Sequence, residues 1–225
     1  MERIICLIIG YCCGLFQTSY YYGKMHGIDI RQHGSGNAGT TNALRTLGKR
    51  AGIITLVGDC LKCMLAVWIV RLIYGRTYPD MIRLLGLYAS AGTILGHNFP
   101  FYLKFKGGKG IAATAGMIIS FDWRITLIEI VVFFGTFFIT HYVSLGSLLV
   151  YVFFIILVVI MGQTGTLMIP RQYIMETYVL VILLALLAFW QHRKNIVKLH
   201  NGTENKTYLK KEKTGDDSNI EESDS

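Results

Sequence analysis

Residues 144–162 read SLGSLLVYVFFIILVVIMG and contain no charged side chain. A helix that crosses the hydrocarbon core of a bilayer, roughly 30 Å thick, needs about 20 mostly apolar residues. The apolar residues here form a continuous block, without amphipathic spacing and without the alternation of a barrel strand. Because backbone groups in lipid must pair within their own segment, the block predicts a membrane-spanning α-helix.

Six further apolar blocks lie along the chain, which has 225 residues, 52% of them hydrophobic and 16% charged. They cover residues 3–22, 51–74, 81–98, 110–121, 124–141 and 173–191. A soluble domain normally carries about a quarter charged residues. The block at 110–121 is too short for a full span, so we expect a tilted or partial helix inside the bundle. The blocks predict an all-α integral membrane protein with about seven transmembrane helices.

Basic residues concentrate in alternate connections, and this predicts the orientation. They gather at residues 24–50, 104–109 and 193–213, whereas the other connections hold mostly scattered arginines. Loops rich in Lys and Arg stay in the cytoplasm. We therefore expect the N-terminus outside, the C-terminus in the cytoplasm and three polar cytoplasmic segments that form one site. The net charge of +8 is then a topology signal, and nucleic acid binding is not expected.

The composition changes near the C-terminus. Residues 1–207 predict a single membrane-embedded domain, and residues 208–225 are charged and polar. A segment that cannot bury apolar surface does not fold by itself, so we expect a disordered cytoplasmic tail there.

The first polar segment contains GSGNAG at residues 34–39, which matches the dinucleotide fingerprint G-x-G-x-x-G. That motif requires a preceding strand, and a membrane helix precedes it here, so we reject the match. Its physics still applies, because successive backbone N–H groups near glycines can hold a phosphate. Hydroxyl, amide and guanidinium groups follow. The candidates are Gly34, Ser35, Gly36, Asn37, Gly39, Thr41, Asn42 and Arg45.

The second polar segment starts with His97-Asn98-Phe99-Pro100 and contains KGGKG at residues 106–110. It is not a Walker A motif, because Leu103 stands where that motif has its first glycine and no Ser or Thr follows the second lysine. Glycines let the backbone approach an anion closely, and lysines neutralise its charge. The candidates are His97, Lys106, Gly107, Gly108, Lys109 and Gly110.

The last apolar block is followed by His192 and Asn195, which a continuing helix would place on one face. Ser144 and Ser147 lie at the remaining connection on the same side of the membrane. Carboxylates are scarce in these segments, which disfavours a site for paired magnesium ions. No metal and no cofactor is expected, and no Ser-His-Asp set suggests a covalent acyl-enzyme.

Taken together, these segments resemble the acyl-phosphate-dependent glycerol-3-phosphate acyltransferases of bacteria, the PlsY-type family. The resemblance covers residues 1–207. Its motifs are GIDIR at 27–31, GSGN at 34–37 with Thr41-Asn42 and Arg45, GHNFP at 96–100, FKGGKG at 105–110, Ser144-Leu145 with Ser147, and His192-Arg193 with Asn195, Gly202 and Glu204. Asp59 and Lys62 also fit the family pattern as structural residues, and Lys198 stands where arginine is common.

The resemblance implies a seven-helix enzyme of the bacterial cytoplasmic membrane. It would transfer a fatty acyl group from acyl phosphate to the 1-hydroxyl of glycerol 3-phosphate, forming lysophosphatidic acid and phosphate in phospholipid synthesis. A soluble acyl-phosphate synthase would supply the donor, and the acyl tail would lie between helices in contact with lipid.

Roles follow from the motifs. Ser35, Asn37, Thr41 and Arg45 would bind a phosphate and orient the donor, and Lys106 to Gly110 would bind glycerol 3-phosphate. Ser144, Ser147, His192 and Asn195 would complete the pocket, while Glu204 would be structural and pair with a cation.

Two questions stay open at this point. The proton of the attacking hydroxyl could pass to the donor's own phosphate or to a histidine, His192 or His97. The rival functions are a transporter of a phosphorylated solute, whose site would normally lie near the membrane midplane, and a metal-dependent alcohol phosphotransferase.

Overall fold

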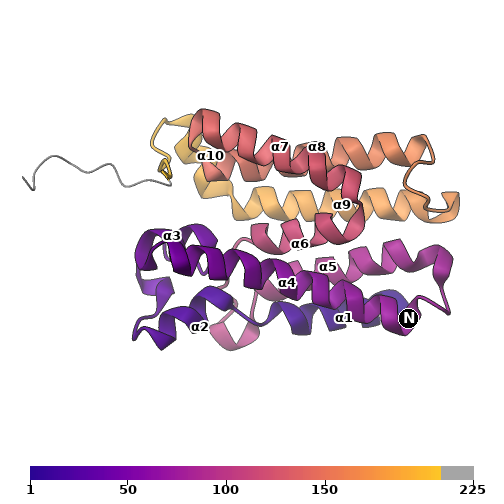
Figure 1. Cartoon of the computed structure of the whole chain (residues 1–225), viewed down its shortest axis with the longest axis horizontal. Helices are drawn as coiled ribbons and strands as arrows, with labels where there is room; N and C mark the ends of the chain where they lie inside the picture. Colours follow the sequence, from indigo (N-terminus) through magenta and orange to yellow (C-terminus); the bar gives the residue numbers. More distant parts are fainter. Residues whose placement is uncertain (209–225) are drawn as a thin grey trace, which may run out of the picture.

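The computed structural model describes residues 1–208 as a bundle of α-helices, seen from the side with its long axis horizontal in Figure 1. The helices are α1 (Glu2–Gly14), α2 (Thr18–Met25), α3 (Thr40–Leu47), α4 (Lys49–Tyr74), α5 (Ile82–Asn98), α6 (Ile111–Phe121), α7 (Trp123–Thr140), α8 (Val143–Gln163), α9 (Arg171–Gln191) and α10 (Arg193–His200). Short 3-10 turns lie at η1 (Ile30–Gln32), η2 (Pro79–Met81) and η3 (Phe101–Leu103). Of the predicted tail at 208–225, only Tyr208 falls within the described residues.

Five candidate spans in the described part of the chain are long and apolar enough to cross a membrane. They are the joined α1 and α2, then α4, α7, α8 and α9. This confirms the all-α membrane class, and the predicted blocks match α4, α7, α8 and α9 to within two residues at each end. Helix α6 has 11 residues and is short, as its block predicts.

Helix α5 differs from the outer helices because most of its side chains are buried. It packs against α1, α4, α6 and α9 and has 17 residues. Outer helices expose large apolar side chains such as Leu72 and Val131, as surfaces that face lipid do. A helix surrounded by protein does not need a continuous apolar surface, so it can carry small and polar residues. Such a helix can lie within the bundle even when its hydropathy is lower than that of the outer helices.

The first predicted span, 3–22, is interrupted in the structure. Helix α1 ends at Gly14, Gln17 has an extended backbone, and α2 begins at Thr18. The Gln17 side-chain amide donates to the carbonyls of Gly14 (3.3 Å) and His97 (3.0 Å), so the Gly14 carbonyl at the break has a partner inside the protein. A break in a membrane helix is tolerated only with such internal partners.

Helices α1 and α5 lie very close together because glycines face each other. A Cβ atom at Gly10 would lie 1.9 Å from the Ala89 carbonyl oxygen, and one at Gly92 would lie 2.0 Å from that of Leu7. Small residues that let backbones approach are a common means of packing helices in membranes. This contact holds α5, and with it His97, in the centre of the bundle.

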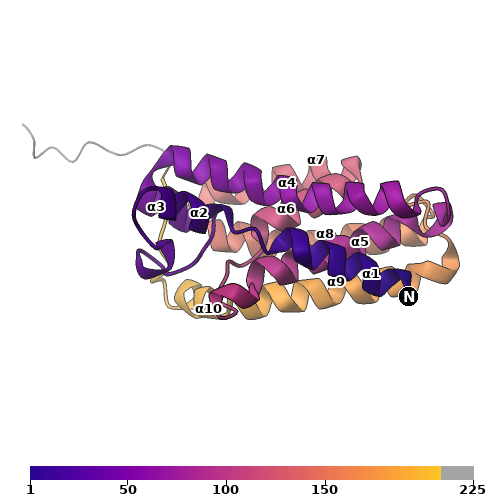
Figure 2. The ribbon, with the colours of Figure 1, turned by 90° about the horizontal axis from the view of Figure 1, so that it is seen from below.

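The polar segments gather at one end of the bundle. Figures 1 and 2 show α3, α2 and α10 at the end opposite the N-terminus, with the connection between α7 and α8 beside α10. Residue 207 reaches this connection, since its backbone N–H donates to the His141 carbonyl (2.9 Å). The same end holds the cavity described next.

Candidate functional site

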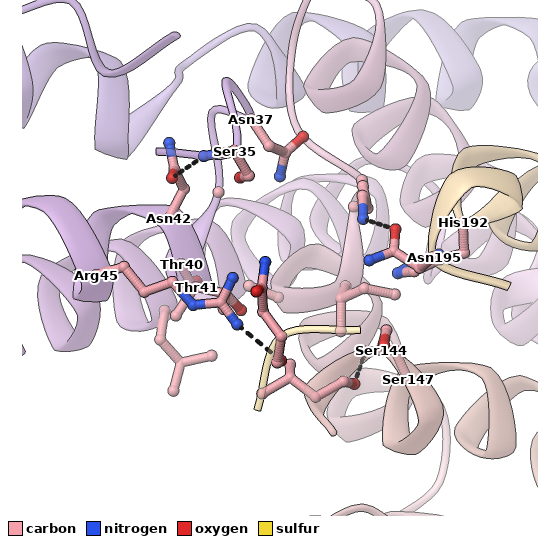
Figure 3. A pocket seen from close by; sticks show the side chains of 18 of the residues that line it. Ser35, Asn37, Thr40, Thr41, Asn42, Arg45, Ser144, Ser147, His192 and Asn195 are labelled. Atoms are coloured by element: carbon pink, nitrogen blue, oxygen red, sulfur yellow. Dashed lines mark hydrogen bonds between the residues drawn. The ribbon is translucent and has the colours of Figure 1, made fainter. Parts of the chain in front are cut away.

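A polar cavity of about 170 Å³ opens at this end, between segments that are far apart in the sequence. The predicted site residues that line it are Ser35, Asn37, Gly39, Thr41, Asn42, Arg45, Asp59, His97, Lys109, Gly110, Ser144, Ser147, His192, Asn195 and Glu204. Figure 3 shows side chains from α3, from α8 and from the junction of α9 and α10 turned toward the same space. All the segments predicted to form the site therefore contribute to one cavity.

The first polar segment is shaped by Asn42. Its side-chain amide donates to the carbonyls of Ile30 and His33 (3.0 Å each), and its oxygen accepts from the Ser35 backbone N–H (2.9 Å, Figure 3). Asn42 is buried and thus folds the loop from within. The loop presents the side chains of Ser35 and Asn37 to the cavity, whereas Gly34 and Gly36 do not line it.

Arg45 connects α3 to the segment after α10. Its guanidinium donates to the Thr207 hydroxyl (2.7 Å) and the Asn205 carbonyl (3.2 Å) while also lining the cavity. A guanidinium has five N–H donors, so donors remain for an anionic ligand. Arg45 can therefore bind an oxyanion while its other hydrogen bonds hold the segment after α10 against the site.

A chain of hydrogen bonds crosses the cavity wall from Lys109 to Ser144. The Lys109 ammonium donates to the Asn195 side-chain oxygen, and the Asn195 amide donates to Glu204 (2.7 Å). The Ser144 hydroxyl donates to the same Glu204 oxygen (3.0 Å, Figure 3). Glu204 was predicted to pair with a cation, but its hydrogen-bond partners are an amide and a hydroxyl. Its other oxygen is buried without a partner among residues 1–208.

Lys109 is the cation of this network, and it is half-buried. Burial lowers the pKa of its ammonium to about 8, because desolvation disfavours the charged form. The nearby cations Arg45 and Lys198 lower the pKa further, and the Glu204 carboxylate partly offsets the change. The Lys109 ammonium is still mostly charged near neutral pH. A bound anion would compensate the hydration that this ammonium loses on burial.

His192 is buried at the start of α10, and its ring is held in one tautomer. Nδ1 lies 2.8 Å from the Ala188 carbonyl and must donate to it, so Nε2 carries the lone pair. Burial, together with the charge of Lys109, lowers the pKa of His192 to about 4. The imidazole is therefore neutral at pH 7 and offers an acceptor to the cavity.

The glycine loop has a different role from the predicted anion cradle. The backbone N–H groups of Gly107 and Gly108 donate to the carbonyls of Asn98 (3.2 Å) and His97 (3.1 Å). A Cβ atom would lie 1.9 Å from the His97 carbonyl oxygen at Gly107 and 2.1 Å from His97 Nε2 at Gly108. Neither glycine lines the cavity, and Lys106 is exposed outside it. The glycines instead dock the loop on α5, and Lys109 and Gly110 reach the cavity.

Several lining residues were not predicted. The polar ones are Lys198 and Asn205, and the apolar ones are Leu56, Ile111, Ala112, Phe133 and Val143. Lys198 had been noted only as a departure from arginine. The apolar residues lie in or beside the predicted spans, so only their spatial arrangement identifies them.

An apolar groove of about 390 Å³ continues from the polar cavity between α4, α6 and α7. The two spaces share Leu56, Ile111, Ala112 and Phe133 in their walls. The rest of the groove is lined almost entirely by aliphatic and aromatic side chains, with Thr126 and Glu129 the polar residues. A ligand with a charged head and an apolar chain would fit both spaces at once.

Known proteins are similar to this chain in sequence and in fold. A profile described as glycerol-3-phosphate acyltransferase matches residues 4–202. Proteins of that name are similar to it in Halalkalibacterium halodurans (40% identity, covering 95% of this chain and all of the relative) and in Clostridioides difficile (40%, covering 93% and 97%).

Solved structures agree with the sequence comparison. The glycerol 3-phosphate form of PlsY (YgiH), an integral membrane glycerol 3-phosphate acyltransferase, superposes with a TM-score of 0.77 at 27% identity, covering 92% of this chain and 96% of that one. Its lysophosphatidic acid form gives 0.75 at 26%, covering 93% and 97%. With a family profile matching nearly the whole membrane bundle, this chain belongs to the glycerol-3-phosphate acyltransferase family.

Proposed function

We propose that this protein transfers a fatty acyl group from acyl phosphate to the 1-hydroxyl of glycerol 3-phosphate, with both phosphates in the polar cavity. Acylation of glycerol 3-phosphate to lysophosphatidic acid follows from membership of the family. The observation that carries the rest is the junction of the polar cavity with the apolar groove. A donor that has both a phosphate and a long acyl chain needs both environments within one molecule's length.

The phosphates would bind to the cations of the cavity. Arg45, Lys109 and Lys198 line it, against the carboxylates Asp59 and Glu204. Arg45, with Ser35, Asn37 and Thr41, would hold the donor phosphate beside α3, in the roles predicted from the sequence. Lys109 and Gly110 would hold the phosphate of glycerol 3-phosphate, with Lys106 attracting it from outside.

The acyl chain would lie in the apolar groove, with its carbonyl near the shared wall at Phe133 and Ile111. Burial of an alkyl chain contributes about 0.8 kcal/mol for each CH₂ group taken out of water. A chain that enters from the bilayer gains less, so the groove would mainly orient the carbonyl for attack. Orientation of this kind can remove several kcal/mol of an activation barrier.

The transfer step needs no covalent enzyme intermediate. The 1-hydroxyl oxygen attacks the acyl carbonyl carbon, the bond from that carbon to the phosphate oxygen breaks, and inorganic phosphate leaves. The departing phosphate takes the hydroxyl proton, while the neutral His192 would orient the hydroxyl through Nε2. The alternative, in which His192 itself takes the proton, remains available to the same geometry. Cations near the leaving phosphate stabilise its developing charge.

We also propose the predicted placement in the membrane. The five candidate spans together with α5 and α6 would make seven, with the cavity facing the cytoplasm of a bacterial inner membrane. Residues 1–207 would form one acyltransferase domain. A soluble synthase would deliver acyl phosphate to the open end.

One assay tests the proposal. Purified protein in detergent is given acyl phosphate, labelled glycerol 3-phosphate and a chelator, and we expect labelled lysophosphatidic acid. Acyl-CoA in place of acyl phosphate should yield none. The variant Lys109→Ala should lower the rate by about a hundredfold, because the bound anion loses a half-buried cation of the cavity wall. The variant Lys49→Ala, which changes an exposed lysine outside the cavity, should keep the wild-type rate. Product from acyl-CoA alone would refute the donor, and no product from either donor would refute the function.

A further inference from the structure

Lys62 lies in the middle of α4, among apolar residues of the bundle, and its side chain is 6% exposed. Its ammonium contacts an Asp59 carboxylate oxygen (2.9 Å), the Phe16 carbonyl (2.6 Å) and His97 Nδ1 (2.8 Å). An ammonium has three N–H donors, and here each has an acceptor. A buried cation is costly unless all its partners are in place. The Lys62 ammonium therefore keeps Asp59, the Phe16 carbonyl and the His97 ring in position.

The contact with Lys62 determines the state of the His97 ring. An ammonium can only donate, so Nδ1 of His97 accepts and the ring hydrogen lies on Nε2. The ring is buried, and the Gln17 amide donates to the His97 carbonyl (3.0 Å). Both the side chain and the backbone of His97 are therefore held from inside the bundle.

His97 in turn supports the glycine loop. Its Nε2 edge packs on Gly108 so closely that a Cβ atom there would lie 2.1 Å away, and its carbonyl accepts the Gly108 N–H (3.1 Å). Lys109, the next residue, lines the polar cavity. A rotation of the His97 ring would displace Gly108 and move the Lys109 backbone with it.

Lys62 also neutralises the charge of the Asp59 carboxylate. Asp59 lines the polar cavity with a carboxylate that receives a hydrogen bond from Thr18 (2.9 Å) as well as from Lys62. Without Lys62 this carboxylate would be an unpaired anion beside a cavity that must receive phosphates. The two effects, on the ring and on the charge, can be separated by substitution.

We propose that Lys62 is a positioning residue for glycerol 3-phosphate: it orients His97, which fixes the loop that carries Lys109. The inference rests on the proposed function, because it concerns one substrate of that cavity. Lys62 itself does not line the cavity, so it acts through His97 and not on the substrate.

The decisive variant is the double substitution Asp59→Asn, Lys62→Met. It removes both charges together and leaves no buried ion unpaired, so the bundle is expected to fold, which a thermal denaturation curve in detergent checks. The KM for glycerol 3-phosphate should rise by about tenfold or more, while the KM for acyl phosphate stays within about twofold, since a small misplacement of one binding group weakens one substrate.

Single variants complete the test. Lys62→Met should be worse than the double variant, because it exposes the phosphates to the Asp59 carboxylate. Lys62→Arg keeps a cation with N–H donors toward His97 and should recover most of the affinity for glycerol 3-phosphate. Thr55→Val, two turns away on the same helix and also buried, is the matched control and should show the wild-type KM.

The outcomes distinguish this inference from the proposed function. Wild-type protein that makes no lysophosphatidic acid refutes the function. Active wild-type protein, together with a folded double variant whose KM for glycerol 3-phosphate is unchanged, refutes only the role of Lys62. An equal rise of both KM values would also refute it, because that result indicates a general structural defect.

Discussion

Lys109 is the residue of the cavity whose charge depends on pH in the range where the protein can be assayed. It combines burial, a hydrogen bond to Asn195 and a pKa lowered to about 8. The ammonium form is the one that binds phosphate, and it is lost as the pH rises through this pKa. Lys109 thus links the pH of the solution to the affinity for the phosphorylated acceptor.

We expect kcat/KM for glycerol 3-phosphate to fall above about pH 8, by roughly tenfold for each further pH unit, because kcat/KM reports groups of the free enzyme. In Lys109→Arg the guanidinium stays charged, so this decline should disappear even if the absolute rate is lower. Rates measured from pH 6 to pH 10 test the assignment. If both proteins declined at the same pH, the titrating group would not be Lys109.

At the same scale, the sequence predicted the residues better than their roles. Ser35, Arg45, His192 and Asn195 line the cavity, as expected. The pair Gly107 and Gly108 does not, because their N–H groups are used by the end of α5. A glycine needed for close approach to a protein backbone looks the same in sequence as one needed for close approach to a ligand.

At the scale of the element, α7 contains a feature that hydropathy does not explain. Glu129 is 4% exposed at the wall of the apolar groove, and neither carboxyl oxygen has a hydrogen-bond partner among residues 1–208. An ionised carboxylate in such surroundings would be very costly, because no hydrogen-bond donor compensates its lost hydration. Even the neutral acid leaves polar atoms unsatisfied, at a cost of about 1–3 kcal/mol.

Glu129→Met should therefore stabilise the protein, raising the midpoint of thermal denaturation in detergent by several degrees, at roughly 2–4 °C for each kcal/mol in a chain of this size. Glu176→Met is the matched control with the opposite sign. Glu176 on α9 accepts hydrogen bonds from Arg3 and from Tyr88 (2.7 Å), so its loss should destabilise. A Glu129→Met variant that melts below the wild type would show that the carboxyl has a stabilising partner.

Helix positions were predictable and the interruption of the first helix was not. Long apolar runs such as α8 must be helical in lipid whatever their neighbours are. The break before α2 depends on Gln17 reaching the His97 carbonyl, 80 residues away in sequence. A local pattern carries no information about that contact.

At the scale of the whole molecule, the bundle places its polar end and its N-terminus at opposite ends (Figure 1). We expect the polar end in the cytoplasm, because the basic segments lie there. In a variant whose five cysteines are replaced by alanine, a cysteine at exposed Lys194 should react with an impermeant reagent only after the membrane is opened. A cysteine at exposed Thr77, on the other side, should react in intact cells. The reverse pattern would overturn the orientation.

Local sequence patterns were enough to identify a helical membrane protein, the segments that interrupt its spans and the chemical groups that those segments carry. This is possible because hydropathy, charge and glycine content are local properties of a segment. They determine how that segment interacts with lipid or with a phosphate, whatever the rest of the chain does. Which polar groups are free to bind a ligand depends on the three-dimensional packing of the chain. Hydrogen bonds accepted by the Asn42 side-chain oxygen, the His97 carbonyl and the Glu204 carboxylate join a loop to a helix, and they form only when the helices are packed. The same packing joined the polar cavity to an apolar groove, a relation that no single segment contains.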